Sequence, residues 1–122
     1  MSKKKAIIFD FNDTLRDKES GKTNKKTLKK AVNAEKREHL IVLSGESPDK
    51  KAKTKNWLKS HDLGKAELEV RPAGNTEPDD KEKEHMLNAY ISRQFKVNTA
   101  YDDKKSNRKM FKRHGIDAKN PK

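Results

Sequence analysis

The residue best placed to do chemistry in this sequence is Asp10, which follows a short apolar run at 6–9. Isoleucine and phenylalanine are typical of buried β-strands, and a continuous apolar run is typical of a strand covered on both faces. Open α/β sheets bind their ligands at the carboxyl edge, where such strands end. We therefore expect the Asp10 carboxylate to lie at a ligand-binding edge.

Three further polar signals follow Asp10 along the chain. Ser44 and Gly45 come directly after a second apolar run, Lys83 lies near the start of a predicted helix, and the pair Asp102-Asp103 follows a predicted strand. Carboxylates that meet at one sheet edge repel each other unless a hard cation binds, and Mg²⁺ prefers such oxygen ligands. An oxygen nucleophile, a bound cation and a neutralising lysine together are suited to phosphoryl transfer.

Apolar runs and amphipathic segments alternate along the chain and must position these residues. We predict strands at 6–11, 39–43, 67–70 and 99–101, and helices at 27–38, 48–61, 79–95 and 103–114. This alternation predicts an α/β fold, a parallel sheet with helices on its faces. The polar segment 17–26 is predicted to be a loop or flap, too short for a separate cap domain.

Length and composition limit the class of protein. The 122 residues predict a single domain, 1–122, with a modest core, because only 30% of them are hydrophobic and 41% are charged. The net charge of +12 favours a polyanionic partner, with lysine-rich solvated helix faces as the alternative. The absence of cysteine excludes disulfides and thiolate metal sites. Without an apolar run long enough for a membrane span or secretory signal, we expect a cytoplasmic protein with no membrane contact.

The run Asp10-Phe11-Asn12-Asp13-Thr14-Leu15 resembles the first motif of the haloacid dehalogenase (HAD) superfamily. Phosphatases of that family carry Asp-x-Asp-x-Thr, so Asn12 replaces the second aspartate. In the family this aspartate protonates the leaving oxygen and then activates water, and asparagine cannot carry that proton. General acid–base catalysis typically contributes about 10²–10⁴-fold to the rate. An engineered variant, a slow natural phosphatase and a pseudoenzyme that only binds all remain open explanations.

The later signals match the other HAD motifs in their order. Segments 71–83 and 101–116 are most similar to the phosphatase domain of the phage polynucleotide kinase–phosphatases, and the resemblance covers residues 5–117. It implies a Rossmann-like HAD core, with a parallel β-sheet flanked by helices and no substantial cap domain. The chain has no Gly-x-x-x-x-Gly-Lys-Ser/Thr loop, so we expect no kinase activity.

The resemblance also implies a role for each motif residue. The implied catalytic residues are Asp10 as nucleophile, Asn12 at the acid–base position, and Lys83, for which Lys81 is the alternative. The implied substrate-binding residues are Thr14, Ser44 and Gly45. The implied Mg²⁺ ligands are Asp10, the Asn12 backbone carbonyl, Asp103 and Asp102, of which Asp102 would also hold the lysine or a water on the metal.

Two further departures from the family pattern concern the residues around the substrate phosphate. Glu46 stands where the family has an arginine that helps to hold the phosphate, and Asn75 replaces an aspartate. Lys22 or Lys25 of the flap is a candidate for the missing cation.

These observations lead to one preferred function and two alternatives. The preferred hypothesis is an Mg²⁺-dependent phosphatase that removes a terminal 3′ phosphate from nucleic acid through an aspartyl-phosphate intermediate. The first alternative is a catalytically weak HAD domain that binds nucleic acid or protein. The second is a phosphatase that acts on a small phosphorylated metabolite.

Overall fold

Five parallel strands form the centre of the molecule in this computed structural model, which describes residues 3–122. The strands are β1 (Lys4–Phe9), β2 (His39–Leu43), β3 (Glu67–Glu69), β4 (Phe95–Tyr101) and β5 (Asp117–Lys119), in the spatial order β3-β2-β1-β4-β5. The main helices are α1 (Lys25–Glu35), α2 (Lys51–Ser60), α3 (Asp79–Met86) and α5 (Lys105–Arg113). Short helical segments are η1 (Pro48–Lys50), η2 (Leu87–Ile91) and α4 (Ser92–Gln94).

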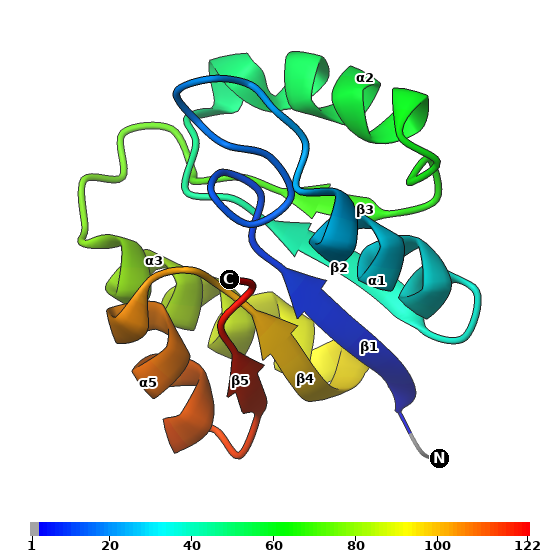
Figure 1. The fold of residues 1–122 in the computed structure, drawn as a ribbon. Helices are drawn as coiled ribbons and strands as arrows, with labels where there is room; N and C mark the ends of the chain where they lie inside the picture. Colours follow the sequence, from blue (N-terminus) through cyan, green and yellow to red (C-terminus); the bar gives the residue numbers. More distant parts are fainter. Residues whose placement is uncertain (1–2) are drawn as a thin grey trace.

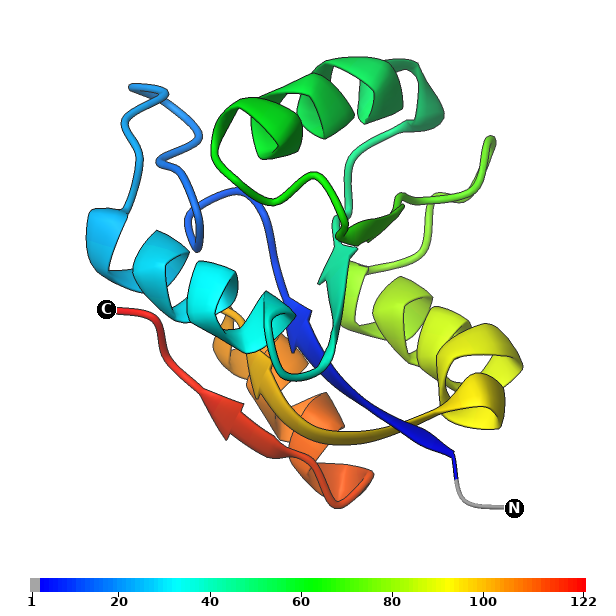
Figure 2. The same ribbon diagram turned by 90° about the vertical axis from the view of Figure 1, so that its right-hand side faces the viewer.

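Helices cover both faces of the sheet, as Figures 1 and 2 show. Helices α1 and α2 lie on one face, where Phe9 and Val42 of the strands pack with Leu58 of α2. Helices α3 and α5 lie on the other face, where Ile8 packs with Phe111. The predicted α/β fold is therefore confirmed, with a parallel sheet between helical layers and no cap domain in the described residues.

The strand order places a binding edge beside β1. From β1 the chain first builds the sheet outward through β2 and β3, and then crosses back to add β4 and β5 on the other side. Open α/β sheets bind ligands at such a switch point, outside the carboxyl ends of the strands. Phe9 pairs with Tyr101, so Asp10 and Asp102, the residues that follow β1 and β4, leave the sheet side by side.

The predicted helix at 79–95 is confirmed as far as Gln94, with a π-helical turn in its second half that was not predicted. Helix α3 gives way at Leu87 to a π-helical turn, a short helix ends at Gln94, and Phe95 already belongs to β4. The strand predicted at 99–101 is present as β4 but begins earlier, at Phe95, and pairs along its length with β1. Phe95 stacks on His39, with ring centroids 4.5 Å apart, and does not lie on a helix face.

Strand β5 was not predicted. Its three residues include two charged ones and no β-branched or aromatic side chain, so the sequence carries little strand signal. Tertiary contacts hold it in place, because Ala118 pairs with Ala100 of β4 and both side chains are buried. The other elements occur within a few residues of their predicted positions, and Gly115, at φ +74°, ends α5 as expected.

The flap folds back on the strand that precedes it. Asn24 caps α1 by accepting a hydrogen bond from the Thr27 amide, so the helix begins at Lys25 and the loop is shorter than predicted. Arg16 forms isolated β-bridges with Asn12 and with Thr23. These bridges hold the start of the flap beside the end of β1.

Candidate active site

A buried lysine joins the two strand-end aspartates. The Lys83 ammonium lies 2.8 Å from Asp10 Oδ1 and 2.9 Å from Asp102 Oδ2, and 3.6 Å from Asp79 Oδ2 on its own helix. The Lys83 side chain is 1% exposed. Lys81 is exposed to solvent, so Lys83 is the lysine that reaches the sheet edge.

The three carboxylates determine the charge state of Lys83. Burial disfavours a charged ammonium, but Asp10, Asp102 and Asp79 outweigh that effect and raise the pKa of Lys83 above its ordinary value. The lysine therefore stays protonated at every physiological pH. Its charge partly compensates the carboxylates that surround it.

The carboxylates themselves are not fully compensated. Burial raises the pKa of Asp10 to about 6, because the opposing effect of Lys83 is smaller and Asp103 adds to the rise. Burial also raises the pKa of Asp102 against the influence of Lys83. Three clustered carboxylates, of Asp10, Asp102 and Asp103, lie around the single Lys83 ammonium, and this excess of carboxylates favours an additional cation.

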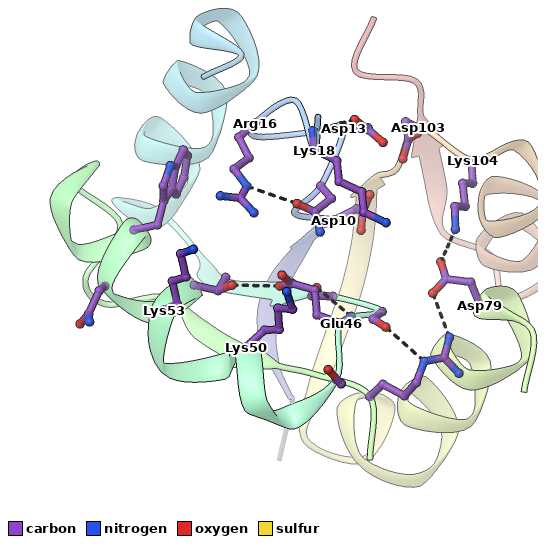
Figure 3. Close-up of a pocket in the computed structure, with 18 of the residues that line it drawn as sticks. Asp10, Asp13, Arg16, Lys18, Glu46, Lys50, Lys53, Asp79, Asp103 and Lys104 are labelled. Atoms are coloured by element: carbon purple, nitrogen blue, oxygen red, sulfur yellow. Dashed lines mark hydrogen bonds and ion pairs between the residues drawn. The ribbon is translucent and has the colours of Figure 1, made fainter. Parts of the chain in front are cut away.

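Three carboxylates could hold that cation. Oxygen atoms of Asp10, Asp102 and Asp103 lie within 4.8 Å of one another. Asp102 already accepts hydrogen bonds from Lys83, from the Asn107 amide and from the Lys104 backbone. Asp103 lines the open cleft (Figure 3). The donor set consists of hard oxygen atoms and fits Mg²⁺.

Thr14 and Asn12 are held by contacts within the first loop. Thr14 is fully buried, and its hydroxyl donates to Asp10 Oδ2 at 3.1 Å. The structure thus places Thr14 behind the nucleophile candidate. The Asn12 side chain accepts a hydrogen bond from Arg16 Nε at 3.2 Å, and the Arg16 guanidinium lies over the Phe11 ring.

The turn after β2 brings Ser44, Gly45 and Glu46 to the same edge. Ser44 is buried, and its hydroxyl donates to Glu46 Oε1 at 2.9 Å. A Cβ atom added at Gly45 would overlap Asp79 Oδ1, so this position requires glycine for close approach. Ser44, Gly45 and Glu46 all line the cleft.

Arg71 and Asn107 belong to the site although the sequence reasoning did not assign them to it. Arg71 donates to the Gly45 carbonyl at 3.1 Å, and its guanidinium lies 3.4 Å from Asp79 Oδ1. Asn107 is fully buried and bridges Asp79 Oδ2 and Asp102 Oδ2 at 2.8 and 3.0 Å. A polar amide on the apolar face of α5 was the signal that could have identified Asn107.

A cleft of about 1040 Å³ opens at the carboxyl edge of the sheet, and Asp10, Asp79 and Asp103 are among the residues that line it (Figure 3). The flap and α2 form one side of it, and the loops before α3 and α5 form the other. The cationic residues that line it are Arg16, Lys18, Lys50, Lys53, Arg71 and Lys104. Lys18 of the flap and Arg16 just before it line the cleft, whereas Lys22 and Lys25 do not.

Helix α2 and the turn before it face the cleft with one stripe of side chains. Lys50, Lys53, Asn56, Trp57 and Ser60 line the cleft, at the spacing of one helical face. Trp57 packs edge-on against Phe11 and stacks on His61, so the indole also forms part of the core between the flap and α2. Within the described residues no helix is long and apolar enough to cross a membrane.

Comparison with known proteins gives a family and a fold. A family model described as the polynucleotide kinase PNKP phosphatase domain matches residues 3–120. No curated protein sequence matches the chain. Two solved structures, of a Pnkp1/Rnl/Hen1 RNA repair complex and of a Pnkp1/Rnl/Hen1 complex, are similar over 98% of this chain, each with a TM-score of 0.89 and 19% identity. This chain spans 43% and 46% of the chains that it matches there, and at this identity the likeness shows the fold.

Proposed function

Because the chain belongs to the family of the polynucleotide kinase PNKP phosphatase domain, we propose that it is a phosphatase that removes a terminal 3′ phosphate from nucleic acid. The observation that carries this proposal is the buried Lys83 ammonium, 2.8 Å from Asp10 and 2.9 Å from Asp102. An ammonium behind a strand-end carboxylate favours attack of that carboxylate on a phosphate, because the ammonium offsets negative charge on the nucleophile and on the intermediate.

Asp10 is the proposed nucleophile. A carboxylate oxygen of Asp10 attacks phosphorus, the bond from phosphorus to the 3′ oxygen breaks, and the nucleic acid leaves as an alcohol after that oxygen gains a proton. Water then hydrolyses the aspartyl-phosphate and regenerates the carboxylate. Thr14 and Lys83 hold the two oxygen atoms of Asp10 in place, and Asp102 and Asn107 orient Lys83 and Asp79.

Mg²⁺ is the proposed cofactor, because the cluster of Asp10, Asp102 and Asp103 has more carboxylates than the one ammonium of Lys83 can compensate. Asp10, Asp102, Asp103 and the Asn12 backbone carbonyl are the proposed ligands. When bound, Mg²⁺ would offset the charge of the carboxylates and of the phosphoryl group. Phosphate release is expected to stop with EDTA and to return on addition of Mg²⁺.

The proposed phosphate-binding groups come from several loops. Ser44 and the turn at Gly45 face the cleft, as the family pattern implies. Glu46 stands where the family has a phosphate-binding arginine, and we assign the role of that arginine to Arg16. Arg16 lies at the cleft and already holds the Asn12 side chain beside the nucleophile. Arg71 serves chiefly to hold Asp79 and the turn at Gly45.

A nucleic acid is the proposed substrate because the cleft is open and its cations extend away from Asp10. Lys50 and Lys53 lie on the cleft side of η1 and α2, where they can pair with backbone phosphates next to the terminal one. The absence of a cap domain in the described residues leaves space for a polymer. A small phosphorylated metabolite would not use this outlying charge.

Asn12 favours a second candidate function, a weak catalyst that mainly binds nucleic acid. The Asn12 amide can hydrogen-bond with Arg16 but cannot transfer a proton to the leaving oxygen. We therefore expect slow turnover. The substitution Asn12→Asp is expected to raise the rate of phosphate release by about 10²-fold or more.

Phosphate release from a 3′-phosphorylated oligonucleotide with Mg²⁺ tests the proposal. The wild-type chain, Asn12→Asp and Asp10→Ala are compared, with Asp117→Ala as the control that removes an exposed carboxylate away from the cleft. The proposal predicts a gain for Asn12→Asp, loss for Asp10→Ala and no change for Asp117→Ala. If neither wild type nor Asn12→Asp releases phosphate, yet both bind the oligonucleotide, the binding function replaces it. Faster hydrolysis of a sugar phosphate would contradict the nucleic-acid substrate.

A further inference from the structure

Glu46 occupies the phosphate side of the cleft with an unusual set of partners. Its Oε1 accepts hydrogen bonds from Ser44 Oγ and from Thr54 Oγ1, each at 2.9 Å. Both hydroxyls belong to buried residues, which are 1% and 3% exposed. Two donors on one oxygen fix the orientation of the carboxylate. Both donors contact Oε1, no described residue donates a hydrogen bond to Oε2, and Glu46 lines the cleft.

We propose that Glu46 selects substrates that carry a hydroxyl next to the scissile phosphate, which in a nucleic acid is the ribose 2′-hydroxyl. The inference rests on the proposed function and specifies its substrate as a 3′-phosphorylated RNA end. A carboxylate that accepts from a ribose hydroxyl is a known means of sugar recognition, and the 2′-hydroxyl is what distinguishes RNA from DNA at a given site.

The proposal follows from the donors and acceptors that Ser44 and Glu46 offer in the turn after β2. The Ser44 hydroxyl has one proton, which it donates to Glu46 in the structure. A phosphoryl oxygen only accepts hydrogen bonds, so Ser44 must turn away from Glu46 to bind the substrate. Oε1 of Glu46 then keeps Thr54 but loses one of its two donors.

A substrate hydroxyl can replace the donor that Glu46 loses. The Ser44–Glu46 hydrogen bond places the carboxylate one side chain away from the proposed phosphoryl site, and a 2′-hydroxyl lies next to a 3′-phosphate in the same sugar. A 2′-deoxyribose offers no donor there, so the carboxylate would face the phosphate with one partner fewer. Sites built to bond a substrate hydroxyl reject the analogue that lacks it, because the polar group of the site is left unpaired.

Two oligonucleotides that differ only at the terminal sugar test the inference. Each carries a 3′-phosphate, one on ribose and the other on 2′-deoxyribose, and kcat/KM is measured for both. The wild-type chain is expected to prefer the ribose end by about 10- to 100-fold, the range for a hydrogen bond to a charged group. The preference is expected to fall to about threefold in Glu46→Gln, because the neutral amide oxygen that remains is a weaker acceptor for the 2′-hydroxyl than the carboxylate.

The matched control is Glu38→Gln, which makes the same change directly before β2, at the opposite edge of the sheet. It is expected to keep the wild-type preference. Equal rates on both ends for the wild type would overturn the inference, and so would an equal loss on both ends in Glu46→Gln, which a purely structural role predicts.

Failure of the proposed function gives a different result. If neither wild type nor Asn12→Asp hydrolyses either end, the phosphatase assignment fails. Fluorescence anisotropy with the same two oligonucleotides then decides the role of Glu46. Tighter binding of the ribose end that disappears in Glu46→Gln supports the inference, and equal affinities overturn it.

Discussion

Gly45 lies so close to Asp79 that a Cβ atom added at Gly45 would overlap the Asp79 Oδ1 atom. The turn after β2 and the first turn of α3 therefore touch through a backbone and a carboxylate. Asp79 cannot easily move, because Asn107, Arg71 and Lys83 all contact it. The same carboxylate links two of the segments that build the site.

Gly45→Ala is predicted to damage the site more than the fold. The added methyl group must displace Asp79, and overpacking of this kind typically costs about 1–3 kcal/mol. Phosphate release is expected to fall by at least about 10-fold, since small misplacements of positioning residues reduce rates strongly. Gly64→Ala is the control, because its Cβ would meet only Lys59 Cγ at 3.8 Å, an ordinary van der Waals contact. Equal effects of the two variants would contradict the prediction.

Lys83→Met is predicted to destabilise the protein as well as to stop turnover. It leaves Asp10, Asp102 and Asp79 without their shared cation, and removing one partner of a buried ion pair costs about 3–5 kcal/mol. Urea unfolding measures the loss. Lys81→Met removes a charge from an exposed position of the same helix and is expected to leave the free energy of unfolding within about 0.5 kcal/mol. A similar loss in both variants would refute the shared-cation argument.

The sequence predicted those parts of the fold that periodicity controls. Strand β2 occurs at the predicted residues, because its apolar run has no competing interpretation. The π-turn at Leu87–Ile91 and the start of β4 at Phe95 were missed, since their residues also fit the continuation of a helix. Strand β5 depends on pairing with β4, which is a tertiary contact that its own three residues do not encode.

The candidate site was predictable where residues directly follow strands. Asp10, Ser44 and Asp102 meet at one edge because parallel strands end there. Arg71 could not be assigned in this way, since a long side chain on a loop can reach many places. The contact between Ser44 and Glu46 was equally hidden, because it depends on the conformation of one turn.

Stability is predicted to fall as the pH rises through the range in which Glu69 ionises. Burial and the neighbouring Glu67 carboxylate raise the pKa of Glu69 from 4.5 to about 7. The folded state therefore binds the Glu69 proton more tightly than the unfolded state does, and the resulting stability, present below pH 4.5, is lost as the pH rises toward 7.

Glu69→Gln tests this pH dependence, since it removes the titrating group while keeping its shape. The melting temperature of the wild type relative to Glu69→Gln is expected to drop by a few degrees between about pH 5 and pH 8. Glu38→Gln is again the control, and its difference from wild type is expected not to change with pH in this way. A difference for Glu69→Gln that stays constant across the range would contradict the assignment.

The lysines that face the cleft are predicted to determine how salt affects nucleic-acid binding. Lys50 and Lys53 line the cleft, whereas Lys55 and Lys59 lie on the exposed part of α2 outside it. Each phosphate contact on a single strand contributes about 0.7 to the slope of log K against log salt concentration. The double variant Lys50→Gln with Lys53→Gln is therefore expected to reduce the slope by up to about 1.4. Lys55→Gln with Lys59→Gln on α2 changes the net charge by the same amount, and its slope is expected to stay near wild type.

Fluorescence anisotropy with a single-stranded oligonucleotide at increasing salt concentrations measures the slopes of the wild type and of the two double variants. Equal reductions in both double variants would mean that overall charge, and not the cleft, attracts the nucleic acid.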